Sequence, residues 1–221
     1  MFDWIHVGAA VPAITVANPQ KNTEEICRLI RQAKDPALLV FPELCVTGYT
    51  CGDLFFQTAL QAAVQESIFR IAKEPEDRPG IVIAGAPLLI NGQLYNCALP
   101  LCQGRLLGVV PKTFLPNYNE FYEQRWFCAA SDLAQTELSP QALGLAQEGT
   151  VPVGNDLIFD AGAFRFGIEL CEDLWTPLSP GTMLALGGAE IIVNLSASNE
   201  VISKRDYRRS LVQQHSAQNL C

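Results

Sequence analysis

The chain has 221 residues, of which 49% are hydrophobic and 17% charged, and its formal net charge is −8. A chain of this length and composition can bury the core of one domain, which excludes intrinsic disorder. The negative charge argues against a nucleic-acid partner, because most of the surface would repel a polyanion. No apolar run approaches the ~20 residues of a membrane span, and no basic leader precedes the first apolar stretch, so we expect a cytoplasmic protein.

Strand-like and helix-like segments alternate in the first part of the chain. We expect a strand over 4–10, a helix over 20–34, a strand over 37–41 and a helix over 57–73. The first helix is amphipathic, since apolar residues recur from Ile26 at i, i+3, i+4 and i+7. The apolar run that ends at Pro42 fits a strand covered on both faces, and Glu43 follows its carboxyl end.

The middle of the chain contains a hairpin signal and a long irregular segment. Strands are expected over 81–85, 88–90, 93–97 and 104–110. Asn91-Gly92 between two of them predicts an antiparallel hairpin. Lys112 follows the last of these strands, just after Pro111. Residues 114–154 are rich in aromatic side chains, and loops of that length are usually functional or disordered, so we expect a packed functional loop.

The last part of the chain returns to a regular pattern. Strands are expected over 156–160, 164–170 and 191–195, and helices over 182–186 and from about 204 onward. The strand over 164–170 runs directly into Cys171. Helices combined with a mixed sheet of many short strands predict a layered α/β architecture in one domain.

The cysteines indicate neither a metal site nor a disulfide framework. They lie at positions 27, 45, 51, 97, 102, 128, 171 and 221 without a CxxC pair, and the chain has two histidines. Zinc sites usually need such pairs or clustered histidines. We expect most of the thiols to be buried as small hydrophobic groups in a reducing compartment.

Three residues with complementary chemistry each follow an apolar strand by one or two positions: Glu43, Lys112 and Cys171. Functional sites in α/β sheets assemble beyond the carboxyl ends of strands, where these residues can meet. A thiolate attacks an amide carbonyl, a carboxylate moves protons, and an ammonium stabilises the anionic intermediate. Taken singly, the three have commoner explanations as a buried thiol, a loop residue and an exposed cation. Their joint placement predicts hydrolysis of a carbon-nitrogen amide bond.

A papain-like cysteine-histidine pair is the rival mechanism. His6 lies inside the first expected strand and His215 in the last expected helix, so neither sits at a strand end. We therefore favour the carboxylate and the ammonium as partners of the thiol, and expect them to favour its thiolate form. Gly187-Gly188 lacks the pattern of a phosphate loop and is interpreted as a helix C-cap.

Three sequence blocks resemble the signatures of the nitrilase superfamily of amidases: FPELCVTGY at 41–49, VPKTFLPNYNEFYEQRWF at 110–127 and IELCEDLW at 168–175. The glutamate, the lysine and the cysteine lie one in each block. CEDLW, EFYEQRWF and the later NLSAS at 194–198 are similar to the glutamine-hydrolysing N-terminal domain of glutamine-dependent NAD synthetases. The resemblance covers essentially the whole chain and implies an αββα sandwich.

The resemblance also implies roles for individual residues. Glu43 would be the general base, Lys112 the oxyanion stabiliser, and Cys171 the residue that forms a thioester with the glutaminyl carbonyl. Glu123 matches the family's additional acid near the cysteine, whereas Glu120 matches a variable position. The implied glutamine-binding residues are Tyr118, Glu172, Trp175, Ser198 and Lys204. Lys204 and Ser203 stand where some relatives have Arg and Gly.

In the family, a further pair of strands completes this domain, and a synthetase domain that uses ATP and Mg²⁺ follows it. Neither occurs within residues 1–221, so we expect a hydrolase domain that needs no cofactor itself, lacks its last strands and is truncated before its synthetase partner. We expect a homo-oligomer, because members of the family generally associate in pairs. Two other functions stay open: a free-standing amidase for another small amide or a nitrile, and a catalytically inactive binding or interface module.

Overall fold

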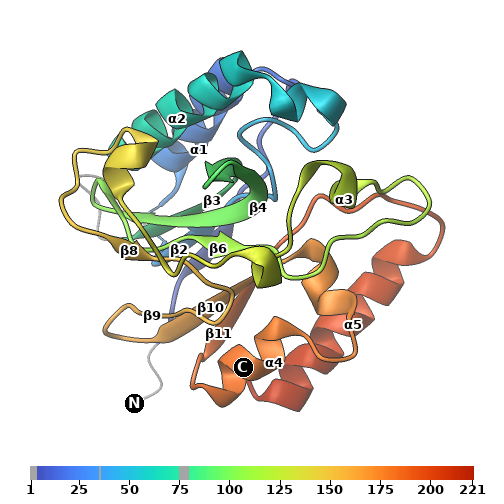
Figure 1. Cartoon of the computed structure of the whole chain (residues 1–221). Helices are drawn as coiled ribbons and strands as arrows, with labels where there is room; N and C mark the ends of the chain where they lie inside the picture. The colour runs from blue at the N-terminus through green and yellow to red at the C-terminus, as the bar shows by residue number, and fades with distance from the viewer. Residues whose placement is uncertain (1–3, 35, 75–79) are drawn as a thin grey trace.

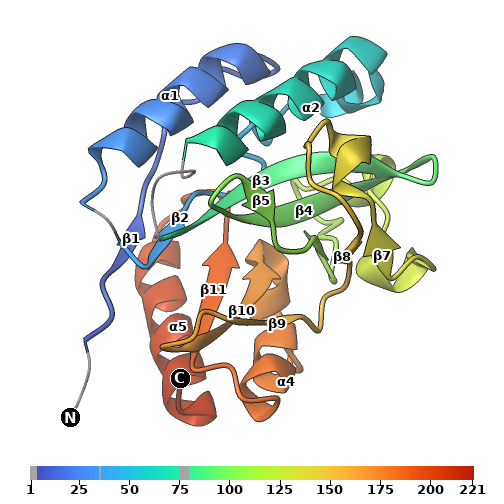
Figure 2. The ribbon, with the colours of Figure 1, turned by 90° about the vertical axis from the view of Figure 1, so that its left-hand side faces the viewer.

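Two β-sheets packed face to face form the centre of the molecule, and helices cover the outer face of each sheet (Figures 1 and 2). The computed structural model describes residues 4–34, 36–74 and 80–221. The layers follow the order helix, sheet, sheet, helix. This arrangement confirms the αββα sandwich that the sequence predicted.

The larger sheet has six strands in the order β1-β2-β3-β4-β5, with β6 paired to β4. Their bounds are β1 Val7–Ala9, β2 Leu38–Val40, β3 Ile81–Ile90, β4 Gln93–Cys102, β5 Arg105–Leu106 and β6 Val110–Pro111. Strands β1, β2 and β3 run parallel, whereas β3 and β4 are antiparallel. Asn91 and Gly92 form the turn between β3 and β4 with φ values of 50° and 79°, which confirms the predicted hairpin.

The smaller sheet has three strands in the order β11-β10-β9. Their bounds are β9 Ile158–Asp160, β10 Arg165–Leu170 and β11 Ile191–Leu195. Strand β10 runs parallel to β11 and antiparallel to β9. A separate pair, β7 Glu137–Leu138 and β8 Val151–Pro152, lies within the long segment that follows Lys112.

Helices α1 and α2 cover the larger sheet, and α4 and α5 cover the smaller one (Figures 1 and 2). The α-helices are α1 Pro19–Gln32, α2 Thr58–Lys73, α3 Glu123–Trp126, α4 Pro180–Leu186 and α5 Lys204–Asn219. The 3₁₀ helices are η1 Gly52–Phe56, η2 Ala130–Asp132, η3 Pro140–Leu143 and η4 Cys171–Trp175. Within residues 4–34, 36–74 and 80–221, no helix combines the length and apolar character that a membrane crossing requires.

Alternation along the strands divides the core into two parts. On β3, Val82 faces the helices and packs in one cluster with Ile68 of α2. Its neighbour Ile83 faces the smaller sheet and packs in a second cluster with Phe166 and Ile168 of β10. Because successive side chains of a strand point to opposite faces, the apolar run of β3 serves both layers.

The structure differs from the sequence-based expectation at two places in the larger sheet. Strand β3 continues through Pro87, where two shorter strands were expected. Strand β2 pairs with β3 only as far as Ile83, so the missing N–H of Pro87 costs no ladder bond on that side. The strand expected over 104–110 is divided into β5 and β6, because Val109 turns away to bond the carbonyl of Pro152.

Gly85 of β3 determines how closely the turn that carries Glu43 can approach the sheet. A Cβ atom at this position would lie 2.5 Å from the Leu44 nitrogen and 2.6 Å from the Pro42 oxygen. Both atoms belong to the backbone, which cannot rotate away as a side chain can.

We expect Gly85→Ala to lower the free energy of unfolding by about 1–3 kcal/mol, because the added methyl group overpacks this contact. Urea unfolding measures the change. Gly8→Ala is the matched control, since its Cβ would meet only side-chain atoms, the nearest at 3.1 Å. Equal stability of the two variants would contradict the prediction.

Candidate active site

The candidate residues of the active site lie beyond the carboxyl ends of strands from both sheets. Glu43 lies in the turn after β2, and Lys112 directly follows β6. Cys171 is the first residue of η4, which directly follows β10. Each side chain is almost fully buried: the residues are 1%, 0% and 6% exposed, respectively.

The Lys112 ammonium is the centre of the polar cluster. Its Nζ lies 2.6 Å from Glu43 Oε1 and 2.6 Å from Glu123 Oε1. Burial alone would lower the pKa of Lys112, but the charges of Glu43 and Glu123 outweigh burial and raise this pKa above its ordinary value. Lys112 is therefore a permanent cation in this site, and two of its three N–H donors are already used.

Two further groups fix the Glu43 carboxylate. Asn96 of β4 donates from Nδ2 to Oε1 at 2.7 Å, and the backbone N–H of Ala197 donates to Oε2 at 3.0 Å. Ala197 belongs to the loop that follows β11, so four strand ends meet at this site. Sequence analysis missed both residues. The signal for Asn96 was a single amide within the apolar β4 run, whereas a backbone N–H leaves no signal in side-chain chemistry.

Glu123 faces inward with 1% exposure, whereas Glu120 is exposed. Tyr49, which sequence analysis also missed, donates its hydroxyl to Glu123 Oε1 at 2.6 Å. Burial raises the pKa of Glu123, and the Lys112 charge opposes that rise. Glu123 Oε2 is buried and has no hydrogen-bond partner among the described residues.

Cys171 has an unusual backbone conformation and a protonated side chain. Its φ is 43°, which non-glycine residues rarely adopt and which often marks functional sites. Ser196 donates its hydroxyl to Sγ at 3.4 Å. Burial raises the pKa of Cys171 to about 12, with the Glu43 charge adding to the rise and the Lys112 charge opposing it. The expectation that both neighbours favour the thiolate is confirmed for the Lys112 charge, which lowers this pKa, and was wrong for the Glu43 charge, which raises it.

The long segment after Lys112 forms one wall of an open cavity of about 750 Å³, a volume typical of small-molecule sites. Tyr118 and Glu172 both line this cavity, and the Tyr118 hydroxyl donates to the Glu172 carboxylate at 2.9 and 3.0 Å. Burial and this hydrogen bond raise the pKa of Tyr118 to about 12. Glu172 directly follows Cys171 in sequence, whereas Cys171 itself is not among the residues that line this cavity.

The other three expected binding residues lie on neighbouring segments outside this cavity lining. Trp175 ends η4 and stacks on the Tyr207 ring with centroids 5.5 Å apart. The Lys204 ammonium lies 5.4 Å from the Trp175 ring centroid and donates to Asn199. Ser198 donates its backbone N–H to the Ser196 hydroxyl at 3.3 Å.

Neither histidine supports the rival cysteine-histidine pair. The His215 ring bonds the Ser179 hydroxyl at 2.7 Å, between α5 and the start of α4. His6 precedes β1 and is exposed. Five of the eight cysteines are buried. Within the described residues, no group of three His, Cys, Asp or Glu side chains is placed to hold a metal ion.

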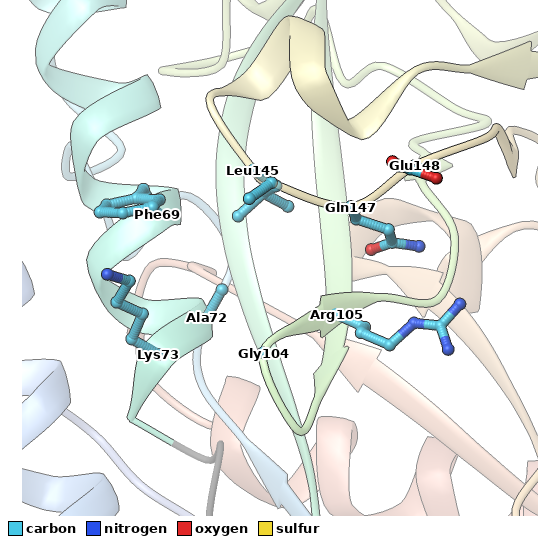
Figure 3. Close-up of a pocket in the computed structure, with 9 residues that line it drawn as sticks. Phe69, Ala72, Lys73, Gly104, Arg105, Leu145, Gln147 and Glu148 are labelled. Atoms are coloured by element: carbon cyan, nitrogen blue, oxygen red, sulfur yellow. The ribbon is translucent and has the colours of Figure 1, made fainter.

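A different cavity, of about 400 Å³, lies between α2 and the turn that joins β4 to β5 (Figure 3). Lys73, Arg105 and Glu148 are among its lining residues. Its lining includes none of the candidate catalytic or substrate-binding residues, so we do not place the active site there.

Residues 7–221 match the carbon-nitrogen hydrolase family, and the chain belongs to that family. It is 33% identical over 229 residues to the glutamine-dependent NAD(+) synthetase of Mycobacterium tuberculosis, covering 98% of this chain and 32% of that protein. The human glutamine-dependent NAD(+) synthetase is 30% identical over 203 residues, covering 90% of this chain and 29% of that protein. The chain thus spans about a third of the length of these relatives.

Solved structures agree with this assignment. A glutamine-dependent NAD(+) synthetase from Cytophaga hutchinsonii has a TM-score of 0.83 at 30% identity, covering 98% of this chain and 34% of that one. An amidase of the nitrilase superfamily from Nesterenkonia sp. AN1 has a TM-score of 0.76 at 16% identity, covering 97% and 72% of the two chains. The second likeness bears on the fold alone.

We expect Lys112→Met to lower the free energy of unfolding by about 3–5 kcal/mol at pH 7.5, because two buried carboxylates lose their counter-charge. The loss should shrink as the pH falls, since unpaired buried carboxylates have raised pKa values and are neutralised by protonation. Urea unfolding at pH 7.5 and 5.5 tests both statements.

The matched control for this variant is Lys73→Met, which removes an exposed ammonium. It should change stability by less than about 0.5 kcal/mol at either pH. A Lys112→Met chain whose stability does not depend on pH in this range would contradict the ion cluster as described.

Proposed function

We propose that this chain hydrolyses the side-chain amide of glutamine, with Cys171 as the nucleophile. One observation carries the proposal: the charge of an ammonium that two buried carboxylates hold in place acts on a buried cysteine with a positive φ. The charges of Glu43 and Lys112 both act on the Cys171 thiol. Family membership and the glutamine-dependent relatives support the choice of reaction and substrate.

The first half-reaction forms a thioester. Because Cys171 is a thiol at neutral pH, its proton must move as the sulfur attacks the amide carbon. Glu43 Oε2 is the proposed acceptor of this proton, since Oε1 already accepts hydrogen bonds from Lys112 and Asn96. The carbonyl oxygen becomes an oxyanion and takes the third N–H of Lys112. Glu43 then gives the proton to the leaving nitrogen, the C–N bond breaks, and ammonia departs.

The second half-reaction restores the enzyme. Glu43 takes a proton from water as the water oxygen attacks the thioester carbon. The oxyanion forms again beside Lys112, the C–S bond breaks, and Cys171 recovers its proton from Glu43. Glutamate is released. Glu123 keeps Lys112 in place throughout both half-reactions. Burial disfavours the charged form of a lysine, and each carboxylate offsets part of that cost.

The cavity beside Glu172 is the proposed entrance for glutamine. Tyr118 and Glu172 would meet the substrate there, with Trp175, Ser198 and Lys204 binding it from neighbouring segments. We propose that residues 1–221 act as one glutamine amidotransferase domain and that the ammonia serves NAD synthesis on a synthetase domain of the same protein. ATP and Mg²⁺ would act only in that partner domain. Pairing into a homo-oligomer remains part of this proposal.

The test measures ammonia and glutamate released from glutamine by the purified chain. Cys171→Ala should abolish release, and Glu43→Gln should lower kcat by at least ~10²-fold, because the proton acceptor is lost. Cys221→Ser, which alters a thiol far from the cluster in sequence, is the control and should keep full activity.

A chloroketone analogue of glutamine separates the alternatives. Mass spectrometry should find it on Cys171 alone, and even labelling of several cysteines would reject the nucleophile. Release of ammonia from propionamide or acetamide at the rate seen with glutamine would favour a general amidase. A chain that neither binds the analogue nor releases ammonia would favour the inactive binding module.

A further inference from the structure

Asp173 connects the two segments that carry the ammonium and the thiol, and the mechanism above does not use it. The residue is 1% exposed and lies two positions after Cys171 in η4. Its Oδ1 accepts the backbone N–H of Phe114 at 2.8 Å. Its Oδ2 accepts the backbone N–H of Leu170 at 3.0 Å and that of Thr113 at 3.4 Å.

These donors lie next to the reacting groups in sequence. Thr113 and Phe114 are the two residues after Lys112, and Leu170 is the residue before Cys171. Strand β6 belongs to the larger sheet and β10 to the smaller one, so the carboxylate bridges the two sheets. One side chain thereby links the segment of the ammonium to the segment of the nucleophile.

Both sheet ladders end at this bridge, and local bonds continue beyond them: the Lys112 carbonyl accepts the Ala130 N–H at 2.9 Å, and Asn155 donates to the Thr113 hydroxyl at 3.0 Å. The ladder between β6 and β4 ends at Pro111, and the Lys112 N–H bonds Asn96 beyond it. On the other segment, β10 ends at Leu170 and the chain enters the positive φ of Cys171. A strained conformation persists only where its surroundings hold it, and Asp173 supplies a bond to the residue directly before the strain.

We propose that Asp173 is a positioning residue for the amide hydrolysis: it fixes the Lys112 ammonium and the Cys171 thiol relative to each other. This inference rests on the proposed function. A misplacement of about 1 Å between reacting groups can cost on the order of 10²-fold in rate, so such a bridge affects turnover without touching the substrate.

Asparagine cannot replace this carboxylate. Both oxygens of Asp173 accept N–H donors, so an amide nitrogen at either position would face a donor and break one or two of the three bonds. Burial raises the pKa of Asp173 to about 7, while the N–H groups of Leu170 and Phe114 and the Lys112 charge oppose the rise. The ionised form of Asp173 is therefore stabilised by these two N–H groups and by the Lys112 charge.

The test compares Asp173→Asn with a matched control, Asp160→Asn. Asp160 is exposed and also accepts a backbone N–H, from Gly162 at 2.7 Å, in the turn after β9. Glutamine kinetics supply kcat and KM, and mass spectrometry supplies the rate at which iodoacetamide alkylates Cys171. Alkylation needs no substrate, so it reports on the thiol even if glutamine is not hydrolysed.

We expect Asp173→Asn to lower kcat at least ~30-fold with KM within about threefold, because Asp173 does not line the substrate cavity. Cys171 alkylation should be at least ~10-fold slower, since the thiol loses its alignment with its proton acceptor. Asp160→Asn should match the wild type in both measurements.

A kcat within threefold of the wild type, or an unchanged alkylation rate, would overturn the role of Asp173. If the wild type itself releases no ammonia from glutamine, the proposed function fails separately, and alkylation alone decides for or against Asp173. Should Asp173→Asn not fold, Asp173→Glu keeps the charge but moves it by one methylene. The same losses are expected, and wild-type rates would overturn the proposal.

Discussion

The buried Lys112 ammonium is the constraint on which the site depends. An isolated cation would not stay charged in this interior, because desolvation would lower its pKa. Glu43 and Glu123 keep it charged, and both must therefore arrive at the same point from distant parts of the chain. Tyr49 and Asn96 in turn hold the two carboxylates. Removing the Lys112 charge leaves two buried carboxylates without compensation, so the bonds that serve the chemistry also serve stability.

The sandwich explains how these charges are brought together. Glu43 and Lys112 follow strands of the larger sheet, whereas Cys171 and the loop with Ala197 follow strands of the smaller sheet. The apolar layer between the sheets fixes their separation, and the charged groups of the site lie beyond the strand ends. Gly85 lets the turn with Glu43 lie close to β3, which a side chain at that position would prevent. The hydrophobic core thus sets the geometry of a polar site that it does not contain.

Much of this fold could be predicted, because periodicity and turn chemistry are local. The hairpin at Asn91-Gly92 and the strand that runs into Cys171 followed from a few adjacent residues. The convergence of Glu43 with Lys112 followed from their placement at strand ends. Other features depend on contacts distant in sequence: β3 continues through Pro87 because β2 has already ended, and Ala197 acts through its backbone. The protonation of Cys171 could not be predicted either, because it depends on how much water the finished fold excludes.

The raised pKa of Cys171 has a consequence for the chain in an oxidising environment. Peroxides and disulfides react with the thiolate rather than with the thiol, and access to the sulfur limits them further. The Cys171 thiol, which is 6% exposed and protonated at rest, is neither a thiolate nor readily accessible. In the proposed mechanism, Cys171 attacks only when a carbonyl carbon lies in place and Glu43 can take the proton in the same step. Burial therefore separates reactivity toward the substrate from vulnerability to oxidants, although both concern the same sulfur atom.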